Sequence, residues 1–413
     1  MKIKCFSIRF LLALFAFVWV SPSWAREKIS FPSFATFDRQ AVRGGHLSIV
    51  FLGGSLTLGE GASQPERTSF RTLLEDYFQE KYPRAKFSFR TVALAGMNSK
   101  RAMFRLKSDV LPQKPDLVFV DFTLEDQIDG TDRQSLAAYE WILRGLISRG
   151  IPVAQILAGN KGSFGADWKH LGPQRFRDHL EMGRLYHTAV GNSFPVTQDF
   201  FQDKTRSRSE IWPAGDLYPG DLGHRFIFES MRAGLEKAIE QKRICALATD
   251  PVFAGEYRKQ FEFFPAEAPL PDGWQVKPAQ ENREKEIRAL PKNLAVCAAA
   301  DAETAQSIRF NFSGTFVGIS GEATENGMGF AVKIDGVTKF YDAFDEIWPT
   351  DSEHGSKSFW YEISDQLEPG SHKIEIQPVF QDDIAQGDLR IESICVAGEG
   401  SSRALLLGNA AGH

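Results

Sequence analysis

Two different hydrophobic patterns divide the chain. Between about residues 46 and 240, short apolar runs alternate with segments whose apolar residues recur at helical spacing. This pattern is typical of an α/β fold whose parallel sheet is covered on both faces. After about residue 249, short alternating runs are separated by turn signals such as Asp335-Gly336 and Pro369-Gly370, which indicate antiparallel strands. The patterning therefore predicts an α/β domain followed by an all-β domain, with a jelly roll as the expected form of the second.

The expected elements of the α/β domain form a three-layer sandwich. Its strands are predicted at 47–52, 87–94, 117–122 and 153–157, with a weaker fifth at 194–196, and its helices at 69–82, 99–110, 133–149, 174–188 and 224–242. In the β domain, strands are predicted at 307–312, 316–320, 330–334, 359–363 and 373–378. The predicted boundaries are 26–250 for the α/β domain, 251–290 for a linker or first β segment, 291–400 for the β-sandwich and 401–413 for a flexible tail.

Residues 1–25 have the pattern of a secretory signal peptide. Lys2, Lys4 and Arg9 precede an apolar run at 10–20, and Ser23 and Ala25 fit the small-residue positions before a cleavage point after Ala25. The run is too short to span a hydrocarbon core of about 30 Å, and no further membrane-spanning stretch follows it. We therefore expect a secreted or periplasmic protein without an integral membrane segment after cleavage.

The composition is that of an ordinary folded protein, with 43% hydrophobic and 24% charged residues over 413 positions. The formal net charge is −5, and removal of residues 1–25 makes it more negative, so nucleic acid is not an expected partner. The remaining cysteines are Cys245, Cys297 and Cys395. In an oxidising compartment Cys297 and Cys395 are the expected disulfide pair, and three buried reduced thiols are the alternative.

A nucleophile candidate stands where the first strand ends, in the sequence Phe51-Leu52-Gly53-Gly54-Ser55. Ligands collect at the carboxyl edge of an open α/β sheet, and glycines there let the backbone approach a substrate closely. The amide of Ser55 would face the same point as its hydroxyl and help to hold an oxyanion. The alternative is that Gly-Gly-Ser is only a turn.

The segment Gly53-Gly54-Ser55-Leu56 resembles the Gly-Asp-Ser-Leu block of the SGNH (GDSL-type) hydrolase superfamily. Residues 93–99 around Gly96, 116–126 and 216–224 are similar to its later blocks, in order, so that the resemblance covers about residues 45–242. It implies a flavodoxin-like sandwich and a serine esterase. It also implies that Ser55 is the nucleophile and that the Ser55 and Gly96 amides form the oxyanion hole.

Glu125 stands at the position where the family has an oxyanion-hole asparagine. An ionised carboxylate would repel the developing oxyanion, and loss of one donor typically costs about 10² to 10³ in rate. Glu125 would help only if it were protonated, turned away, or replaced by another donor. Asn98 and Asn160 follow predicted strand ends and are the candidates for that replacement.

The residues that would accept the serine proton also differ from the family pattern, because Gly215 and Tyr218 stand where the family has Asp and His. A phenol with its ordinary pKa of about 10 is a poor general base near neutral pH. His224 and Asp221 restore the required residue types a few positions later and are the predicted base and its orienter. The alternative is that His224 is a structural residue before the last helix.

Other polar residues are weaker candidates for the same site. Asp216 would orient whichever imidazole is present, and His170 is a distant alternative to His224. His179 and His187 lie in a helical pattern and are expected to be packing residues. No His/Cys cluster has metal-ligand spacing, and no phosphate-binding loop follows a strand, so no cofactor is expected.

The β domain is similar to the galactose-binding-like jelly rolls that accompany secreted carbohydrate esterases, on residues 312–319, Asp335-Gly336 and 367–372. Aromatic side chains there would either offer flat faces to sugar rings or fill the sandwich core, with Trp348 the one most expected to be exposed. They are Phe340, Tyr341, Phe344, Trp348, Phe359, Trp360 and Tyr361.

These observations favour an exported serine esterase that removes O-acyl groups, most simply O-acetyl, from a carbohydrate or envelope polysaccharide. The substrate class comes from the pairing of domains in similar proteins, which is an analogy at the level of the fold. Two alternatives stay open: a polysaccharide O-acetyltransferase with the same serine, and a catalytically degenerate domain that binds polysaccharide during envelope assembly.

Overall fold

The computed structural model describes residues 31–128, 130–164, 173–253, 257, 259–280, 293–298, 301, 304–324, 327–343, 357–379, 387–398 and 405–406. The predicted signal peptide, His170, Phe344, Trp348 and most of the predicted C-terminal tail lie outside these residues. Among the helices described, none is both long and apolar enough to span a membrane.

A parallel sheet with the strand order β2-β1-β3-β4-β5 forms the centre of the first domain. Its strands are β1 (His46–Gly53), β2 (Lys86–Ala93), β3 (Leu117–Asp121), β4 (Val153–Leu157) and β5 (Ala189–Asn192). All residues of β3 and β4 are buried, as expected for strands that are covered on both faces.

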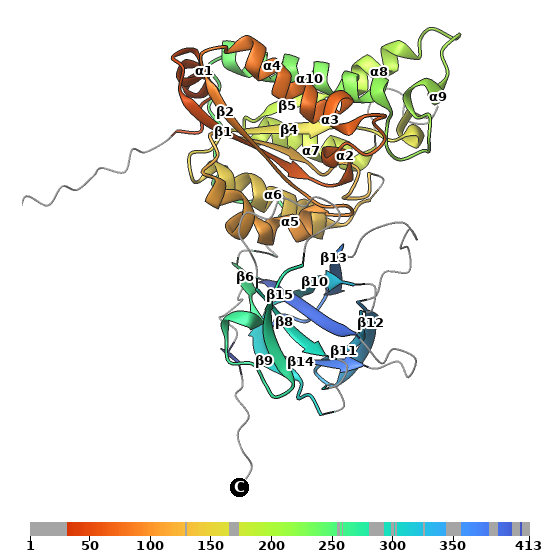
Figure 1. Ribbon diagram of the computed structural model, residues 1–413. Helices are drawn as coiled ribbons and strands as arrows, with labels where there is room; N and C mark the ends of the chain where they lie inside the picture. Colours follow the sequence, from red (N-terminus) through yellow and green to blue (C-terminus); the bar gives the residue numbers. More distant parts are fainter. Residues whose placement is uncertain are drawn as a thin grey trace, which may run out of the picture.

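Helices cover both faces of this sheet (Figure 1). On one face lie α1 (Phe34–Val42), α4 (Phe70–Lys81) and α10 (Asp221–Glu240), and on the other lie α5 (Ser99–Arg105) and α6 (Arg133–Ile147), with α7 (Gln174–Leu185) beside α6. Helix α5 continues into a π-helical turn, Leu106–Val110. The shorter helices are α2 (Ser55–Leu58), α3 (Pro65–Thr68), α8 (Phe194–Phe200) and α9 (Arg208–Ile211). The predicted three-layer α/β sandwich is confirmed.

Local sequence signals explain where the principal helices start. The Ser69 hydroxyl accepts a hydrogen bond from the Thr72 amide at the start of α4, and the Asp132 carboxylate accepts one from the Ser135 amide at the start of α6. These side chains satisfy amide groups that have no partner inside the helix. Both helices had been predicted to within a few residues.

The predicted fifth strand at 194–196 is wrong. The strand is β5, which ends at Asn192, and the apolar run that follows it belongs to helix α8. Pro195 lies in the first turn of α8, where its fixed φ and missing N–H are tolerated. Phe194 packs against Phe176 of α7, with ring centroids 4.0 Å apart. A run of three apolar residues is too short to distinguish these outcomes by periodicity.

The second domain consists of two antiparallel sheets. One has the order β13-β10-β15-β8-β7, with β6 also paired to β15, and the other has the order β12-β11-β14-β9-β16. The strands are β6 (Lys259–Phe263), β7 (Trp274–Pro278), β8 (Asn293–Ala298), β9 (Ile308–Ser313), β10 (Phe316–Ala323), β11 (Gly329–Ile334), β12 (Val337–Asp342), β13 (Lys357–Ser364), β14 (Ser371–Val379), β15 (Asp388–Gly398) and β16 (Leu405–Leu406). The predicted all-β domain is confirmed. Strands β6 and β7 come from the segment assigned to a linker or first β segment.

Of the two alternatives for the cysteines, the Cys297–Cys395 disulfide is not formed, because Cys245, Cys297 and Cys395 are all free and buried. Cys297 of β8 is paired with Leu389 of β15, six positions before Cys395. At about 3.3 Å per residue, this separates the two cysteines by roughly 20 Å along the strand. A disulfide needs Cα atoms within about 7 Å, so the alternative of three buried thiols holds.

The two domains share an apolar contact. Phe104 of α5 packs against Phe316 of β10 and Trp360 of β13, with ring centroids 5.7 and 6.3 Å apart. Beside these rings, the Lys100 ammonium forms ion pairs with Glu362 at 2.8 Å and with Asp365 at 3.3 Å. Figure 1 shows α5 and α6 between the parallel sheet and the β domain. The β domain is therefore docked against one helical layer of the first domain.

The aromatic residues predicted for sugar contact have different environments. Phe359 is buried, and Trp360 belongs to the domain contact. Tyr341 and Tyr361 pack against each other with ring centroids 5.0 Å apart, whereas Phe340 on β12 is 72% exposed.

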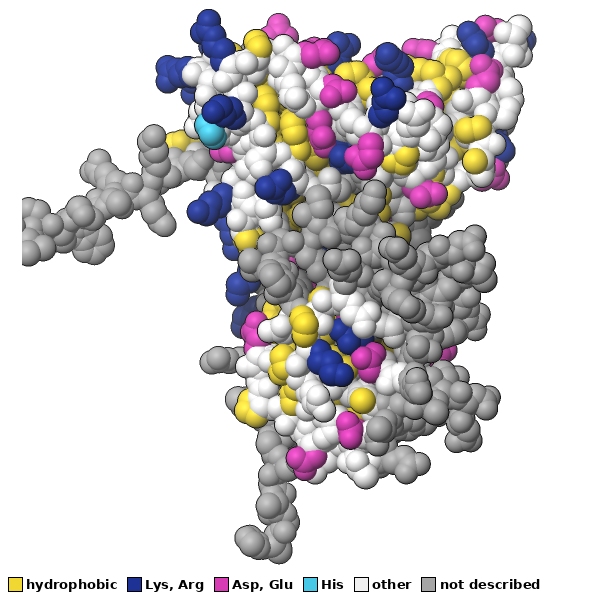
Figure 2. Space-filling view, viewed as in Figure 1, with side chains coloured by type: hydrophobic (Ala, Val, Ile, Leu, Met, Phe, Trp, Pro, Cys, Tyr) yellow, Lys and Arg dark blue, Asp and Glu magenta, His cyan; other side chains and the backbone are white. Residues whose placement is uncertain are grey.

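On the face of the molecule in Figure 2, Lys and Arg side chains are interspersed with Asp and Glu.

We expect the domain contact to contribute measurably to stability. Phe104→Ala removes a side chain that is only 4% exposed and should lower the free energy of unfolding by about 3 kcal/mol, as buried Phe truncations do. Phe340→Ala is the matched control, because its ring is exposed, and should change stability by less than about 0.5 kcal/mol. Urea unfolding followed by tryptophan fluorescence measures both. Equal effects of the two substitutions on the free energy of unfolding would contradict the expected contribution of this contact.

Candidate active site

The sheet brings three loops to one edge. Gly53, the last residue of β1, is paired with Ala93 of β2 on one side and with Asp121 of β3 on the other. Because the strands are parallel, the segments that follow them emerge at the same edge. Ser55, Gly96 and Glu125 lie on these segments, so neighbours in space come from three separate parts of the sequence.

Ser55 is the first residue of helix α2 and is buried. Its Oγ accepts a hydrogen bond from the Gly96 amide at 3.4 Å. Gly96 has φ of +68°, a left-handed conformation that favours glycine and that sets the direction of this amide. Ser55 and Gly96, both predicted for this site, are therefore brought together by the fold.

The carboxyl group of Glu125 lies against Gly54, immediately before Ser55. A Cβ atom at position 54 would come within 2.5 Å of the Glu125 carboxyl carbon, so only glycine leaves room for that group. Burial and the charge of Asp121 raise the pKa of Glu125 to about 8, while hydrogen bonds from the Leu56 and Ser55 amides act in the opposite direction. Glu125 thus occupies the space beside the Ser55 amide that would otherwise serve an oxyanion.

Tyr218 connects Ser55 with Glu125. Its hydroxyl donates a hydrogen bond to Glu125 Oε1 at 3.5 Å. Burial and the charge of Glu125 raise the pKa of Tyr218 to about 12, although its contact with the Ser55 hydroxyl lowers it. A phenol with this pKa is neutral at physiological pH and can both accept and donate a hydrogen bond.

The structure contradicts the predicted roles of His224 and Asp221. His224 Nδ1 accepts a hydrogen bond from the Phe70 amide at 3.2 Å, and its Nε2 donates to the Glu60 carbonyl at 3.0 Å. Both ring nitrogens are therefore engaged by the backbone, and neither is directed at Ser55. The Asp221 carboxylate binds the Thr68 hydroxyl and the Ser63 amide and hydroxyl instead of orienting the imidazole. The structural alternative for His224 accounts for these contacts.

The remaining candidates lie apart from Ser55 or are occupied. Asp216 is exposed and forms an ion pair with Lys161 at 2.7 Å. Asn160 Oδ1 accepts hydrogen bonds from the Ser163 amide and hydroxyl, which cap the adjacent turn. Asn98 lines a cavity beside Glu125, but its side-chain oxygen accepts a hydrogen bond from the Arg101 amide as the cap of α5. In both asparagines the side-chain oxygen is therefore engaged in a local cap.

The predicted packing role is confirmed for His179, which is fully buried and stacks on Tyr139 with ring centroids 3.8 Å apart, whereas His187 is exposed.

Sequence reasoning missed two buried carboxyls near the site. Asp121 accepts a hydrogen bond from the Thr57 hydroxyl at 2.7 Å, and Asp126 accepts one from the Ser99 amide at 2.8 Å. The signal for Asp121 was an acidic residue at the end of the otherwise apolar strand β3. Within the described residues, no group of three or more His, Cys, Asp or Glu side chains is arranged to hold a metal ion.

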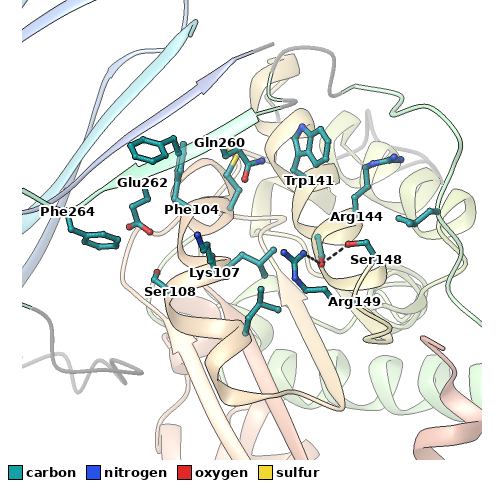
Figure 3. Close-up of a pocket in the computed structure, with 16 residues that line it drawn as sticks. Phe104, Lys107, Ser108, Trp141, Arg144, Ser148, Arg149, Gln260, Glu262 and Phe264 are labelled. Carbon is teal, nitrogen blue, oxygen red and sulfur yellow. Dashed lines mark hydrogen bonds between the residues drawn. The ribbon is translucent and has the colours of Figure 1, made fainter. Parts of the chain in front are cut away.

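A polar cavity of about 560 Å³ opens beside Glu125. Asn98, Lys100 and Ser135 of the first domain line it together with Glu362 of the β domain. A second cavity, of about 550 Å³, lies between α5, α6 and β6 (Figure 3), and Ser55 is not among the lining residues of either cavity. There the Ser148 hydroxyl and Arg149 both donate to the Gly145 carbonyl, so these groups hold the end of α6.

Comparison with known proteins identifies the family that the first domain matches. Residues 51–226 match the model of the GDSL-like Lipase/Acylhydrolase family. The first domain is a GDSL-like lipase/acylhydrolase domain. The matched region of this GDSL-like domain starts within β1 and ends within α10, so it includes Ser55, Gly96, Glu125 and Tyr218. The comparison with curated proteins found no match.

Solved structures show the same two-domain arrangement. A two-domain esterase (CEX) active on acetylated mannans is similar with a TM-score of 0.66 and 18% identity, over 89% of this chain and 95% of that one. The same esterase co-crystallized with mannopentaose is similar with a TM-score of 0.65, 18% identity and the same coverage. An acetyl xylan esterase from Geobacillus stearothermophilus covers 46% of this chain and 94% of its own, with 14% identity and a TM-score of 0.39. The family that residues 51–226 match is one of lipases and acylhydrolases, and the two-domain fold is similar to that of the esterase active on acetylated mannans.

Because the backbone forms hydrogen bonds to both ring nitrogens of His224, we expect this side chain to stabilise the folded state. His224→Ala leaves the buried Phe70 amide without its acceptor and should cost about 2 kcal/mol at pH 7.5. Burial lowers the pKa of His224, so below about pH 6.5 the unfolded chain takes up a proton that the folded chain does not. The wild type therefore loses stability on acidification, and the difference between wild type and variant should shrink by pH 5.

Chemical unfolding at the two pH values measures this difference. His46→Ala is the control, because His46 is exposed at the start of β1. A difference between wild type and His224→Ala that grows at pH 5 would contradict the neutral, structural state of this imidazole.

Proposed function

We propose that this protein is an exported serine esterase that removes O-acyl groups, most simply O-acetyl, from a carbohydrate or envelope polysaccharide. The observation that carries the proposal is the contact between the Ser55 hydroxyl and the Gly96 amide at the carboxyl edge of the sheet. A nucleophile and an oxyanion donor must converge on one ester carbonyl, and these two groups do so.

In the proposed reaction, Ser55 Oγ attacks the ester carbonyl and loses its proton. The Gly96 amide donates a hydrogen bond to the oxyanion of the tetrahedral intermediate. The sugar alkoxide leaves with a proton, and water then hydrolyses the acyl-serine to release the carboxylic acid and restore Ser55. If a sugar hydroxyl replaced water in the last step, the same serine would make an O-acetyltransferase.

The polar cavity beside Glu125 supports a hydroxyl-rich substrate over a lipid. Lys100, Ser135 and Glu362 present charged and hydroxyl groups to it from both domains. An acyl chain of a lipid would gain little from such a lining, whereas sugar hydroxyls pair with it. The esterase of similar fold is active on acetylated mannans, which motivates acetyl as the acyl group. Export is proposed from the pattern of residues 1–25.

A second function is favoured by one observation: the described structure places no imidazole on Ser55, and the Glu125 carboxyl lies against Gly54, immediately before Ser55. On this alternative, the GDSL-like domain and the β domain hold a polysaccharide during envelope assembly without cleaving it. Binding would then occur with acetylated and deacetylated polysaccharide but without release of acetate.

Hydrolysis of an aryl acetate and of acetylated mannan by the purified protein tests the proposal. We expect Ser55→Ala to lower the rate by roughly 10⁴-fold or more, since the nucleophile is lost. Ser48→Ala is the matched control, because Ser48 lies on the same strand and donates to the Gln113 carbonyl far from the site. The rate should also fall as the acyl chain of the aryl ester is lengthened.

A wild type as inactive as Ser55→Ala, with an intact circular dichroism spectrum, would overturn the esterase. Retained binding to the mannan in that case would support the assembly role. Transfer of acetyl to an added oligosaccharide, with little acetate released, would instead identify a transferase.

A further inference from the structure

The proposed esterase reaction requires a group that takes the proton of Ser55, and this inference rests on that function. His224 does not meet the requirement, because both of its ring nitrogens are bonded to the backbone. Among the residues that the structure describes, Tyr218 and Glu125 are titratable side chains close to Ser55: the Glu125 carboxyl lies against Gly54, and the Tyr218 hydroxyl donates to it. A carboxylate at this position would only obstruct the reaction unless it took part in it.

We propose that Tyr218 and Glu125 together move the Ser55 proton: the Tyr218 phenol relays it, and the Glu125 carboxylate accepts it. Tyr218 would act as a hydrogen-bonded bridge and Glu125 as the general base.

Three elements hold this chain of groups. Ser55 begins α2, Glu125 follows β3, and Tyr218 lies in the loop before α10. The phenol contacts the Ser55 hydroxyl on one side and lies 3.5 Å from Glu125 Oε1 on the other. Glu125 is fixed by its packing on Gly54 and by the amides at the start of α2. Hydrogen bonds of this length in an unliganded site can shorten when substrate binds, and proton transfer then becomes possible.

Electrostatics assign different parts to the two groups. With a pKa of about 8, about a tenth of Glu125 is ionised at pH 7 and about half at pH 8, so the carboxylate is basic enough to accept the proton and becomes more available as the pH rises. The Tyr218 pKa of about 12 keeps its hydroxyl neutral, so it passes a proton on and does not store one. The charged groups near Glu125 are Asp121 of β3, which raises its pKa, and the side chains that line the adjoining cavity, Lys100, Asp126, Asp132 and Glu362.

The step balances without any further reactant. As Ser55 Oγ forms its bond to the ester carbonyl carbon, its proton passes to the Tyr218 oxygen, and the Tyr218 proton passes to Glu125. The electron pair of the carbonyl π bond becomes the oxyanion. When the intermediate collapses, the carbon–oxygen bond to the sugar breaks, and the proton returns by the same route to the leaving alkoxide.

This route also removes the conflict that an acidic residue creates in the oxyanion region. An ionised Glu125, which lies against Gly54 beside Ser55, repels negative charge. After it has accepted the proton, it is neutral and no longer repels the oxyanion. The negative charge on the carboxylate therefore disappears in the same step in which the oxyanion appears.

The experiment is a pH profile of kcat/KM for aryl acetate hydrolysis. For the wild type we expect the rate to rise with pH and to level off above a midpoint near 8, because Glu125 must be ionised. Glu125→Gln should lower the rate by about 10²- to 10⁴-fold and abolish this rise, since an amide accepts no proton. Tyr218→Phe should lower kcat to a similar extent with little change in KM, because the relay is broken while the cavity persists.

The chain offers a matched pair of controls. Tyr77 donates to Glu236 at 2.9 Å on the helices α4 and α10, away from Ser55. Tyr77→Phe and Glu236→Gln should leave the rate within about threefold of wild type. The pH dependence of Ser55 labelling by a fluorophosphonate in the wild type gives the same midpoint without any substitution, so the test does not depend on a variant that folds poorly.

The outcomes separate this inference from the proposed function. A wild type no more active or labelled than Ser55→Ala would overturn both. Ser55-dependent hydrolysis that persists in Glu125→Gln or Tyr218→Phe, with the pH rise unchanged, would overturn only the relay. If Glu125→Gln were as active as wild type or more active, Glu125 would act solely through hydrogen bonding beside the oxyanion, and its role as base would be wrong.

Discussion

The site depends on one buried contact, the packing of the Glu125 carboxyl against Gly54. Because position 54 has no side chain, a carboxylate reaches the amides at the start of α2 and lies beside Ser55. The low-dielectric surroundings make its charge costly, which is why its affinity for a proton is raised. The contact therefore places a proton acceptor of suitable strength next to the hydroxyl that needs one.

The arrangement changes how the last helix is understood. In this chain the start of α10 is stabilised by polar contacts that face away from Ser55: Asp221 binds the segment around Ser63 and Thr68, and His224 binds the backbone on either side of α3. These contacts tie α10 to the loop after α2. They fix the preceding loop, and with it Tyr218, against the sheet edge. A histidine of the expected type thus serves the architecture and not the chemistry.

The β domain contributes to the same region through the helical layer on which it is docked. The rings of Phe104, Phe316 and Trp360 form an apolar contact, and the ion pairs of Lys100 with Glu362 and Asp365 lie beside it. Partly buried charge pairs of this kind specify an orientation more than they add stability. One result is that Glu362 reaches the cavity next to Glu125, so the polar surface offered to a substrate comes from both domains.

The two domains, most strands and helices and the position of Ser55 could be predicted from the amino-acid pattern, because period-2 and helical patterns and glycine-rich strand ends are local properties. The resemblance of short blocks also identified Gly96, Glu125 and Tyr218 as notable. Four further features became known from the fold: which hydrogen-bond partners His224 has, that Glu125 lies on Gly54, that the short run at Phe194 is helical, and that Cys297 and Cys395 are far apart. Those outcomes depend on strand register, burial and distances between remote segments, which spacing along the chain does not encode.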